Sequence, residues 1–230
     1  MKTIGIIGGM SWESTAVYYQ NLNRLAQERL GGLHSAQLLL WSFDFAEIEA
    51  HQMAGDWDSA TRSMVEAAQR LELGGAECIV IATNTMHLMA ADVQAAVDIP
   101  LIHIADATAT AIRNAASKSP LLLGTRFTME RDFYKGHLQT HHDITAMIPG
   151  DADREVIHNV IYEELCQGLV RAESKSAYLD IVKRMEEEGA DGVIFGCTEI
   201  GLLLSADDLN VPAFDTAELH ARAAMDYALD

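Results

Sequence analysis

Short apolar runs alternate with longer amphipathic stretches along this chain. Continuous apolar runs of about four to eight residues are typical of strands that are covered on both faces of a parallel sheet. We expect strands over residues 2–8, 36–42, 77–82, 100–104, 119–124, 143–148, 191–196 and 211–215. The stretches between them predict helices over 12–30, 57–73, 85–96, 106–117, 128–139, 152–167, 174–188 and 216–229. This alternation indicates an α/β fold with mostly parallel sheet.

One strand pattern occurs twice. The segment GAECIVIATNT at residues 75–85 returns as GADGVIFGCTE at residues 189–199. Matching segments flank both copies in the same order and at nearly the same spacing: 4–8 with 121–124, and 99–104 with 211–216. A repeat of this length is typical of a duplicated domain. We therefore expect two lobes of similar fold.

The charge balance excludes several classes of partner. The chain has 230 residues, of which 34 are acidic and 16 basic, for a formal net charge of −18. Such a charge repels phosphate backbones and anionic lipid heads. No stretch approaches the roughly 18 apolar residues of a membrane span. We expect no nucleic-acid partner and no membrane partner.

The first residues and the cysteines indicate the compartment. The start, MKTIGIIGG, has a short apolar run followed at once by two glycines, so we interpret it as the first strand and not as an export signal. Three cysteines in a chain without an export signal favour free thiols in a reducing environment. The sequence therefore predicts a cytoplasmic protein.

Polar or small residues follow four of the predicted strands. Ligands of open parallel sheets bind outside the carboxyl ends of the strands, where helix N-termini present free amides. If the two lobes face each other, Thr83 and Cys197 lie on opposite sides of one cleft, because they end equivalent strands of the repeat. The four strand ends are Gly8-Gly9-Met10-Ser11, Thr83-Asn84-Thr85, Gly124-Thr125-Arg126 and Cys197-Thr198-Glu199.

Cys197 is the strongest candidate for chemistry. It ends an apolar strand and precedes a predicted helix start, an environment that lowers the pKa of a thiol from about 8.5. A thiolate there can act as a base or a nucleophile, and the alternative is a buried structural cysteine. Cys78 lies inside a strand and Cys166 inside a helix, so we interpret both as structural.

The other candidates each have a structural alternative. Thr83, Asn84 and Thr85 can hold a carboxylate or an oxyanion, or they can simply cap a helix. His87, one turn further on, either supports this site or packs in the core. Arg126 is a cation in a strand-end loop and can pair with a substrate carboxylate, unless it lies exposed at the surface.

The sequence supports neither a dinucleotide-binding site nor a metal site. Gly8 and Gly9 let the backbone approach a ligand, but the third glycine of a dinucleotide-binding fingerprint is missing. His137, His141 and His142 lack a neighbouring cysteine or carboxylate pattern, so they indicate a solvated helix end and not a metal site. We expect neither a cofactor nor a metal.

Four motifs resemble the aspartate/glutamate racemase family over essentially the whole chain: GIIGGMSWEST at 5–15, NTMH at 84–87, LLGTRFTM at 122–129 and GVIFGCTEIGLL at 192–203. The resemblance implies an α/β fold of two pseudo-symmetric three-layer lobes, each with a mostly parallel four-stranded sheet, and an active site in the cleft between them. The expected lobes are 1–104 plus 210–230, and 105–209. It also implies a homodimer that racemises amino acids without pyridoxal phosphate or metal.

The resemblance assigns roles to two strand ends. In that family two cysteines, in CNT and GCT motifs, act on opposite faces of the substrate's α-carbon. Cys197 matches the second cysteine, whereas Thr83 stands where the first is expected. A threonine hydroxyl is too weak an acid to serve as a base near neutral pH. We therefore expect Cys197 to deprotonate an L-amino acid and the Thr83 side to return a proton poorly, which makes the enzyme L-preferring.

The substrate is less firmly indicated. The family's carboxylate-binding arginine and lysine fall near Ile48 and Cys166, so both cations are missing. L-aspartate and L-glutamate are the first choice, with a broad range of L-amino acids as the alternative. The predicted substrate-binding residues are Met10, Gln52, Asn84, Thr85, Thr125, Arg126, Thr128, Glu164 and Thr198, supported by Gly8, Gly9, Ser11, His87 and Glu199.

Two other functions fit a chain with one of the two cysteines. Decarboxylases of the arylmalonate type in the same superfamily keep only the second cysteine and use it to protonate an enediolate. A noncatalytic amino-acid sensor is the second alternative, because two lobes around a cleft suit ligand-dependent closure. A periplasmic solute-binding protein requires an export signal, which we do not find in the sequence.

Overall fold

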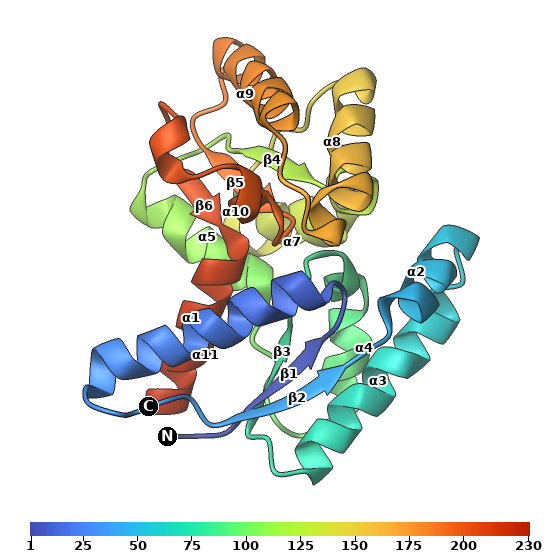
Figure 1. Ribbon diagram of the computed structural model, residues 1–230, viewed down its shortest axis with the longest axis vertical. Helices are drawn as coiled ribbons and strands as arrows, with labels where there is room; N and C mark the ends of the chain where they lie inside the picture. Colours follow the sequence, from blue (N-terminus) through green and yellow to red (C-terminus); the bar gives the residue numbers. More distant parts are fainter. The chain divides into compact units, whose positions relative to one another are not determined.

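The computed structural model describes all residues from Met1 to Asp230, and the chain forms two compact units, each built around its own sheet (Figure 1). Met1–His103 and His220–Asp230 form the first unit, and Ile104–Leu219 form the second. The chain returns to the first unit at His220, inside the last helix, and not at residue 210, where the sequence placed this boundary. The reason is that β6 (Ala213–Asp215) pairs with β5 (Val193–Gly196) and so belongs to the second unit.

The two sheets share one strand order. In the first unit β1 (Ile4–Gly8) lies between β2 (Leu38–Ser42) and β3 (Cys78–Ile81), and all pairs are parallel. In the second unit β4 (Leu121–Gly124), β5 and β6 are parallel neighbours in that order. Single parallel bridges add Leu101 beside β3 and Met147 beside β4. With these bridges counted, both sheets run second, first, third, fourth in chain order, as a duplicated domain predicts.

In each sheet one of the four expected strands, 100–104 in the first unit and 143–148 in the second, is reduced to its bridge. The segment 100–104 is cut short because α5 (Ile104–Asn114) begins two residues earlier than predicted, at the first residue of the second unit. In the second unit, Asp143 has a left-handed conformation (φ 56°) after α7 (Asp132–His142), and α8 (Asp151–Glu163) begins soon afterwards. The predicted α/β class is confirmed, with three regular strands per sheet instead of four.

Several helices have the predicted bounds. The helices α1 (Trp12–Leu30), α3 (Trp57–Leu73) and α11 (Thr216–Leu229) match exactly, and α9 (Ala172–Glu187) matches closely. The sequence missed α2 (Phe45–Ala54), although the Asp44 side chain caps its first turn and Gly55 (φ 70°) ends it. It also missed the short α10 (Ile200–Leu203) and the 3₁₀ turn η3 (Ala206–Asp208).

Three long predicted helices are interrupted. Residues 85–96 form the 3₁₀ turn η1 (Thr85–Met89) followed by α4 (Ala90–Ala95). The stretch predicted at 128–139 forms α6 (Arg126–Glu130) and then α7, because Arg131 between them is extended (φ −83°, ψ 155°). The stretch predicted as one helix at 152–167 forms α8, which ends at Glu163, and then the 3₁₀ turn η2 (Leu165–Gln167).

Apolar side chains cover both faces of the second sheet. Leu121, Leu123 and Phe195 pack in one cluster with residues of α8 and α9. Leu122 and Ile194 point the other way, into a cluster with residues of α5 and α7. Burying one such side chain contributes roughly 1.5–3 kcal/mol, so the alternating strand residues hold three layers together.

In the first unit one face of the sheet packs against α2, α3 and α4. Ile7 and Ile81 share a buried cluster with Ile48 of α2, Met64 of α3 and Val93 of α4. No helix of the structure combines the length and the apolar composition needed to cross a membrane.

Candidate active site

Cys197 directly follows β5, where the sequence predicted it, and only 8% of its surface is exposed. The preceding Gly196 is held tightly against the neighbouring strand. A Cβ atom there would lie 2.5 Å from Cδ1 of Leu122 and 2.8 Å from the carbonyl oxygen of Leu123. This close packing fixes the backbone from which the thiol projects.

The Cys197 thiol belongs to a buried hydrogen-bond network. Its Sγ donates to Oε2 of Glu199 over 2.9 Å, and the Thr198 hydroxyl donates to the same oxygen over 2.8 Å. The Cys166 thiol donates to Oε1 of Glu199 over 3.7 Å. Thr198 and Glu199 are themselves buried. One carboxylate therefore accepts hydrogen bonds from three side chains.

This network reverses the expected electrostatics of the thiol. Burial raises the pKa of Cys197 well above its usual range, and the nearby Glu199 and Cys166 raise it further. The prediction that a helix start lowers this pKa is wrong, because α10 has only four residues and a carboxylate lies in contact with Sγ. Cys197 therefore rests as a thiol at neutral pH.

The strand end after β4 forms a helix cap. The Thr125 side chain accepts from the backbone N–H of Thr128 at the start of α6, and the two hydroxyls lie 3.2 Å apart. Both threonines are buried. Arg126 is exposed, and its backbone N–H donates to Nδ1 of His158 over 3.3 Å. Its guanidinium is thus in reach of a solvent-borne anion.

Neither position that the resemblance assigns to a cation carries one. Ile48 is buried in the core of the first unit, and Cys166 lies in η2. Glu164, a predicted polar candidate nearby, accepts from the Ser174 hydroxyl over 2.6 Å and lies 3.7 Å from the Arg171 guanidinium. Its carboxylate is therefore partly occupied by neighbours within the second unit.

The strand end after β3 is also buried. Thr83, Asn84 and Thr85 are buried. The 3₁₀ turn η1 begins at Thr85, and the side chain of the preceding Asn84 makes no capping hydrogen bond to it. Nδ1 of His87 lies 2.8 Å from the carbonyl oxygen of Thr83. A carbonyl only accepts, so Nδ1 carries the proton and His87 holds the backbone of Thr83. The His87 ring also packs edge-on against His103, with centroids 4.9 Å apart.

The loop after β1 requires glycine and caps a helix. Gly9 has φ 82°, and a Cβ there would lie 2.4 Å from backbone atoms of Phe43. Its N–H donates to the Thr15 hydroxyl over 2.8 Å. Ser11 caps α1 by accepting from the backbone N–H of Ser14 over 3.3 Å. These contacts set the course of the loop that follows the first strand.

The remaining predicted residues of the first unit are closely packed. Met10 and Gln52 are 4% and 5% exposed, and Nε2 of Gln52 lies 3.2 Å from Sδ of Met86. A Cβ at Gly8 would lie 2.6 Å from the Thr15 side chain. The sulfur contact links Gln52 to the 3₁₀ turn η1, which contains Met86. No local sequence pattern indicates it.

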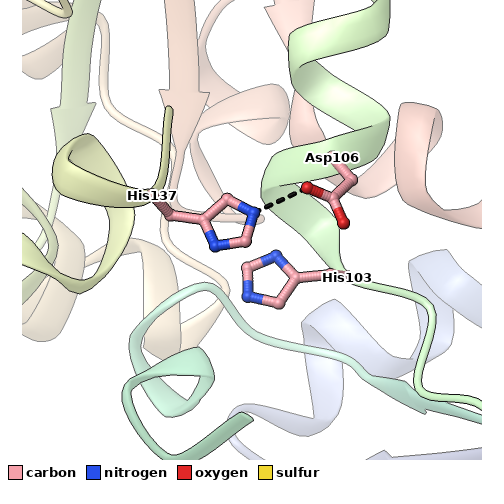
Figure 2. Close-up of side chains that lie close together, drawn as sticks. All are labelled: His103, Asp106 and His137. Atoms are coloured by element: carbon pink, nitrogen blue, oxygen red, sulfur yellow. Dashed lines mark hydrogen bonds and ion pairs between the residues drawn. The ribbon is translucent and has the colours of Figure 1, made fainter. Parts of the chain in front are cut away.

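A histidine cluster on α7 is bound to a carboxylate that the sequence analysis did not associate with it. Nε2 of His137 lies 2.6 Å from Oδ1 of Asp106 on α5 (Figure 2). Nε2 of His142 lies 2.7 Å from the same oxygen. Nδ1 of His142 accepts from the Arg113 guanidinium over 2.8 Å, so Nε2 of the same ring donates to Asp106. The cluster thus joins α5 to α7; His103, also drawn in Figure 2, directly precedes α5.

Comparison with known proteins gives a consistent result. The family model described as Asp/Glu/Hydantoin racemase matches residues 7–224. The chain is 22% identical to the broad specificity amino-acid racemase RacX of Bacillus subtilis (strain 168), over 96% of each chain. A crystal structure provisionally described as an Asp/Glu racemase from Yersinia pestis is 51% identical with a TM-score of 0.93, and each chain is fully covered. An aspartate racemase homologue from Pyrococcus horikoshii OT3 is 37% identical with a TM-score of 0.87, again over both whole chains.

Proposed function

Because the chain belongs to the Asp/Glu/Hydantoin racemase family and is thus an amino-acid isomerase, we propose that Cys197 removes the α-proton of an L-amino acid. The proposal rests on one observation: the residues that follow two equivalent strands differ. Thr83 follows β3 and Cys197 follows β5, the third strand segments of their units. Only one of the two strand ends offers a thiol.

The proposed reaction moves one proton off the substrate and another onto it. The Cys197 thiol first loses its proton to solvent. The bond between Cα and its hydrogen then breaks, an S–H bond forms at the Cys197 thiolate, and the electron pair delocalises into the substrate carboxylate. A proton from water at the Thr83 side then adds to the opposite face and completes the inversion. The Thr83 hydroxyl is a poor base, so removal of the proton from a D-amino acid at that side is slow. The enzyme is therefore L-preferring.

L-aspartate and L-glutamate are the proposed substrates, in keeping with the family, and Arg126 is the proposed partner of their side-chain carboxylate. Ile48 and Cys166, at the positions implied for cations, favour a wider range of L-amino acids as the alternative. The relative RacX is named for broad specificity, which supports that alternative. We further propose that the enzyme needs neither pyridoxal phosphate nor metal, because Cys197 and water at the Thr83 side can carry both proton transfers. We also propose that it acts as a cytoplasmic homodimer.

Exchange of the α-hydrogen in deuterium oxide tests the proposal. Each L- and D-amino acid is incubated with the enzyme, and loss of the α-hydrogen signal is followed by nuclear magnetic resonance. We expect exchange of L-aspartate and L-glutamate to be faster than exchange of their D-enantiomers. Equal rates for both enantiomers would contradict the L-preference, and thermal protection by an amino acid without any exchange would identify a sensor.

One observation favours a second function. Cys197 rests as a thiol beside Glu199, and a thiol is the form that donates a proton. A decarboxylase of the arylmalonate type needs that donor to protonate its enediolate. Release of carbon dioxide from a substituted malonate, lost in Cys197→Ala, would establish this function; no release from any malonate tested would remove it.

A further inference from the structure

One carboxylate and two histidines lie together at the start of α5. They are Asp106 in the first turn of that helix, His137 on α7, and His103, which directly precedes α5 (Figure 2). We propose that these three side chains bind a divalent transition-metal ion, with zinc as the best match, and that the ion links the start of α5 to α7. The ion takes no part in the proposed proton transfers, so failure of one proposal does not affect the other.

The three side chains are close enough to share one ion. One ligand atom from each, a ring nitrogen or a carboxylate oxygen, lies within 4.8 Å of the other two. Nε2 of His137 and Oδ1 of Asp106 lie 2.6 Å apart. The ligand atoms of a tetrahedral zinc site, with bonds of about 2.0–2.1 Å, are roughly 3.3 Å from one another. Side-chain rotations that change these separations by about 1.5 Å or less therefore bring all three atoms to one ion.

The residue types match zinc. Two imidazole nitrogens and one carboxylate oxygen leave a fourth tetrahedral position, which water can occupy. Imidazole is a good ligand of zinc, copper and nickel, whereas magnesium and calcium prefer oxygen ligands. The net charge of −18 adds a long-range attraction for any cation. The cluster therefore favours a transition metal over magnesium or calcium.

Two further side chains orient the carboxylate. Nε2 of His142 donates to Oδ1 of Asp106 over 2.7 Å, because Nδ1 of the same ring accepts from the Arg113 guanidinium. The hydrogen on Nε2 keeps His142 from acting as a ligand through that atom. Carboxylates that bind metals are commonly held by such outer hydrogen bonds. His142 and Arg113 therefore support the site without binding the ion.

The cluster is accessible from solvent on one side and enclosed on the other. The Asp106 side chain is 52% exposed and that of His137 is 20% exposed, and His103 is also partly buried. An ion can therefore reach the carboxylate first and the two rings afterwards. The ion replaces the hydrogen that Nε2 of His137 shares with Asp106, and the ring stays neutral by carrying its hydrogen on Nδ1.

The sequence did not indicate this site. From the sequence, His137, His141 and His142 form a solvated helix end, because no carboxylate lies near them in the chain. Asp106 precedes His137 by 31 residues. Only the packing of α5 against α7, which share one buried apolar cluster, brings the carboxylate and the imidazole together.

Titration with zinc tests the site directly. The protein, without an affinity tag and freed of metal by a chelator, is titrated with Zn²⁺ in a calorimeter. We expect one ion per chain with a Kd of about 1 μM or lower. His103→Gln, Asp106→Asn and His137→Gln should each weaken binding at least about 100-fold, because even an outer partner of a ligand contributes about 10–100-fold.

A matched control separates this site from a simpler one. Two histidines one helical turn apart, His137 and His141, can also bind a metal ion. His141→Gln removes an exposed histidine from the same helix and should leave the Kd within about threefold of the wild type. Loss of binding in His141→Gln, with unchanged binding in Asp106→Asn and His103→Gln, overturns the proposal. A Kd above about 0.1 mM for the wild type means adventitious binding only and also overturns it.

Thermal unfolding gives a second measurement, which also shows whether each variant is folded. An ion that binds only the folded chain raises the midpoint of unfolding. Excess Zn²⁺ should raise the midpoint of the wild type and of His141→Gln, but not that of Asp106→Asn, and Mg²⁺ should raise none of them. An equal rise in the wild type and in Asp106→Asn, or no rise in the wild type, overturns the proposal.

Discussion

The hydroxyl oxygen of Tyr18 lies 2.8 Å from Nδ1 of His220, and Nε2 of the same ring lies 2.6 Å from the carbonyl oxygen of Ile102. Because a carbonyl only accepts, Nε2 carries the proton and Nδ1 accepts from Tyr18. A neutral, fully buried imidazole therefore joins α1, α11 and the segment before α5 in the first unit. Protonation of the ring would break the bond from Tyr18.

We expect this histidine to make the protein less stable in acid. Burial lowers the pKa of His220 to about 4, whereas the pKa of a histidine in the unfolded chain is about 6.5. Between these values the unfolded chain binds a proton that the folded chain does not. The stabilisation is complete above about pH 6.5 and falls by roughly 3 kcal/mol as the pH drops to about 4.

Urea unfolding at a series of pH values measures this effect. His220→Gln should lose this component of the pH dependence, since the amide can donate and accept but does not titrate. His34→Gln, at an exposed position, should keep it. The same pH dependence in the wild type and in His220→Gln would show that the acid sensitivity lies elsewhere.

Asp191 should stabilise the start of β5. Its carboxylate accepts from the Ser117 hydroxyl over 2.6 Å and from the backbone N–H groups of Lys118 and Ser119 over 2.7 Å and 3.0 Å. Burial alone raises the pKa of this carboxyl, but the hydrogen bonds outweigh it and lower the pKa overall. The stabilisation is therefore present at neutral pH and is lost as the pH falls through the lowered pKa.

The test is Asp191→Asn, whose amide nitrogen faces a donor. We expect the free energy of unfolding in urea at pH 7 to fall by about 1–3 kcal/mol. Asp207→Asn, which removes an exposed carboxylate, should change it by less than about 0.5 kcal/mol. Equal stability of Asp191→Asn and the wild type would mean that the three hydrogen bonds contribute nothing net.

Local chemistry explains where the sequence predicted the fold correctly. The helices α1 and α3 begin at side chains that cap them, Ser11 and Asp56, and end at glycines. The interruption at Arg131 carries no proline or glycine. Its extended conformation therefore has no signature in the local sequence.

In the candidate site, too, local patterns predicted some features and missed others. The repeated pattern places Thr83 and Cys197 at strand ends, because both copies carry the same strand followed by polar residues. The contact between Cys166 and Glu199 joins residues 33 positions apart and has no local signature. The raised pKa of the Cys197 thiol depends on burial and on Glu199, so helix position alone gave the wrong sign.

Arg126 should contribute to affinity for an acidic substrate. An exposed guanidinium can pair with a carboxylate through two hydrogen bonds, but water weakens the interaction. We expect Arg126→Gln to raise the KM for L-glutamate about three- to tenfold with little change in kcat. Arg131→Gln, at an exposed cation just after α6, should leave the KM unchanged. An unchanged KM in Arg126→Gln would remove Arg126 from the substrate site.

Thr83→Cys should make the two directions of racemisation more equal. The pKa of a thiol is about 8.5, far below that of a hydroxyl, so a thiol can serve as both base and acid. The initial rates from L to D and from D to L, followed by circular dichroism, should differ less than in the wild type. Thr83→Ser keeps the hydroxyl and should keep the bias. A Thr83→Cys enzyme as biased as the wild type would show that residue 83 does not set the stereochemical preference.

Cys197 should be the one cysteine on which exchange depends. Cys197→Ser retains a hydrogen-bond donor to Glu199 but replaces the thiol by a much weaker acid, so exchange of L-substrates should fall by about 10³-fold or more. Cys78 lies in β3, where burial raises the pKa of its thiol to about 12, so it should not act as a base. Cys78→Ser should therefore retain exchange wherever circular dichroism shows a folded protein. Loss of exchange in folded Cys78→Ser, or its persistence in Cys197→Ser, would assign the base to another group.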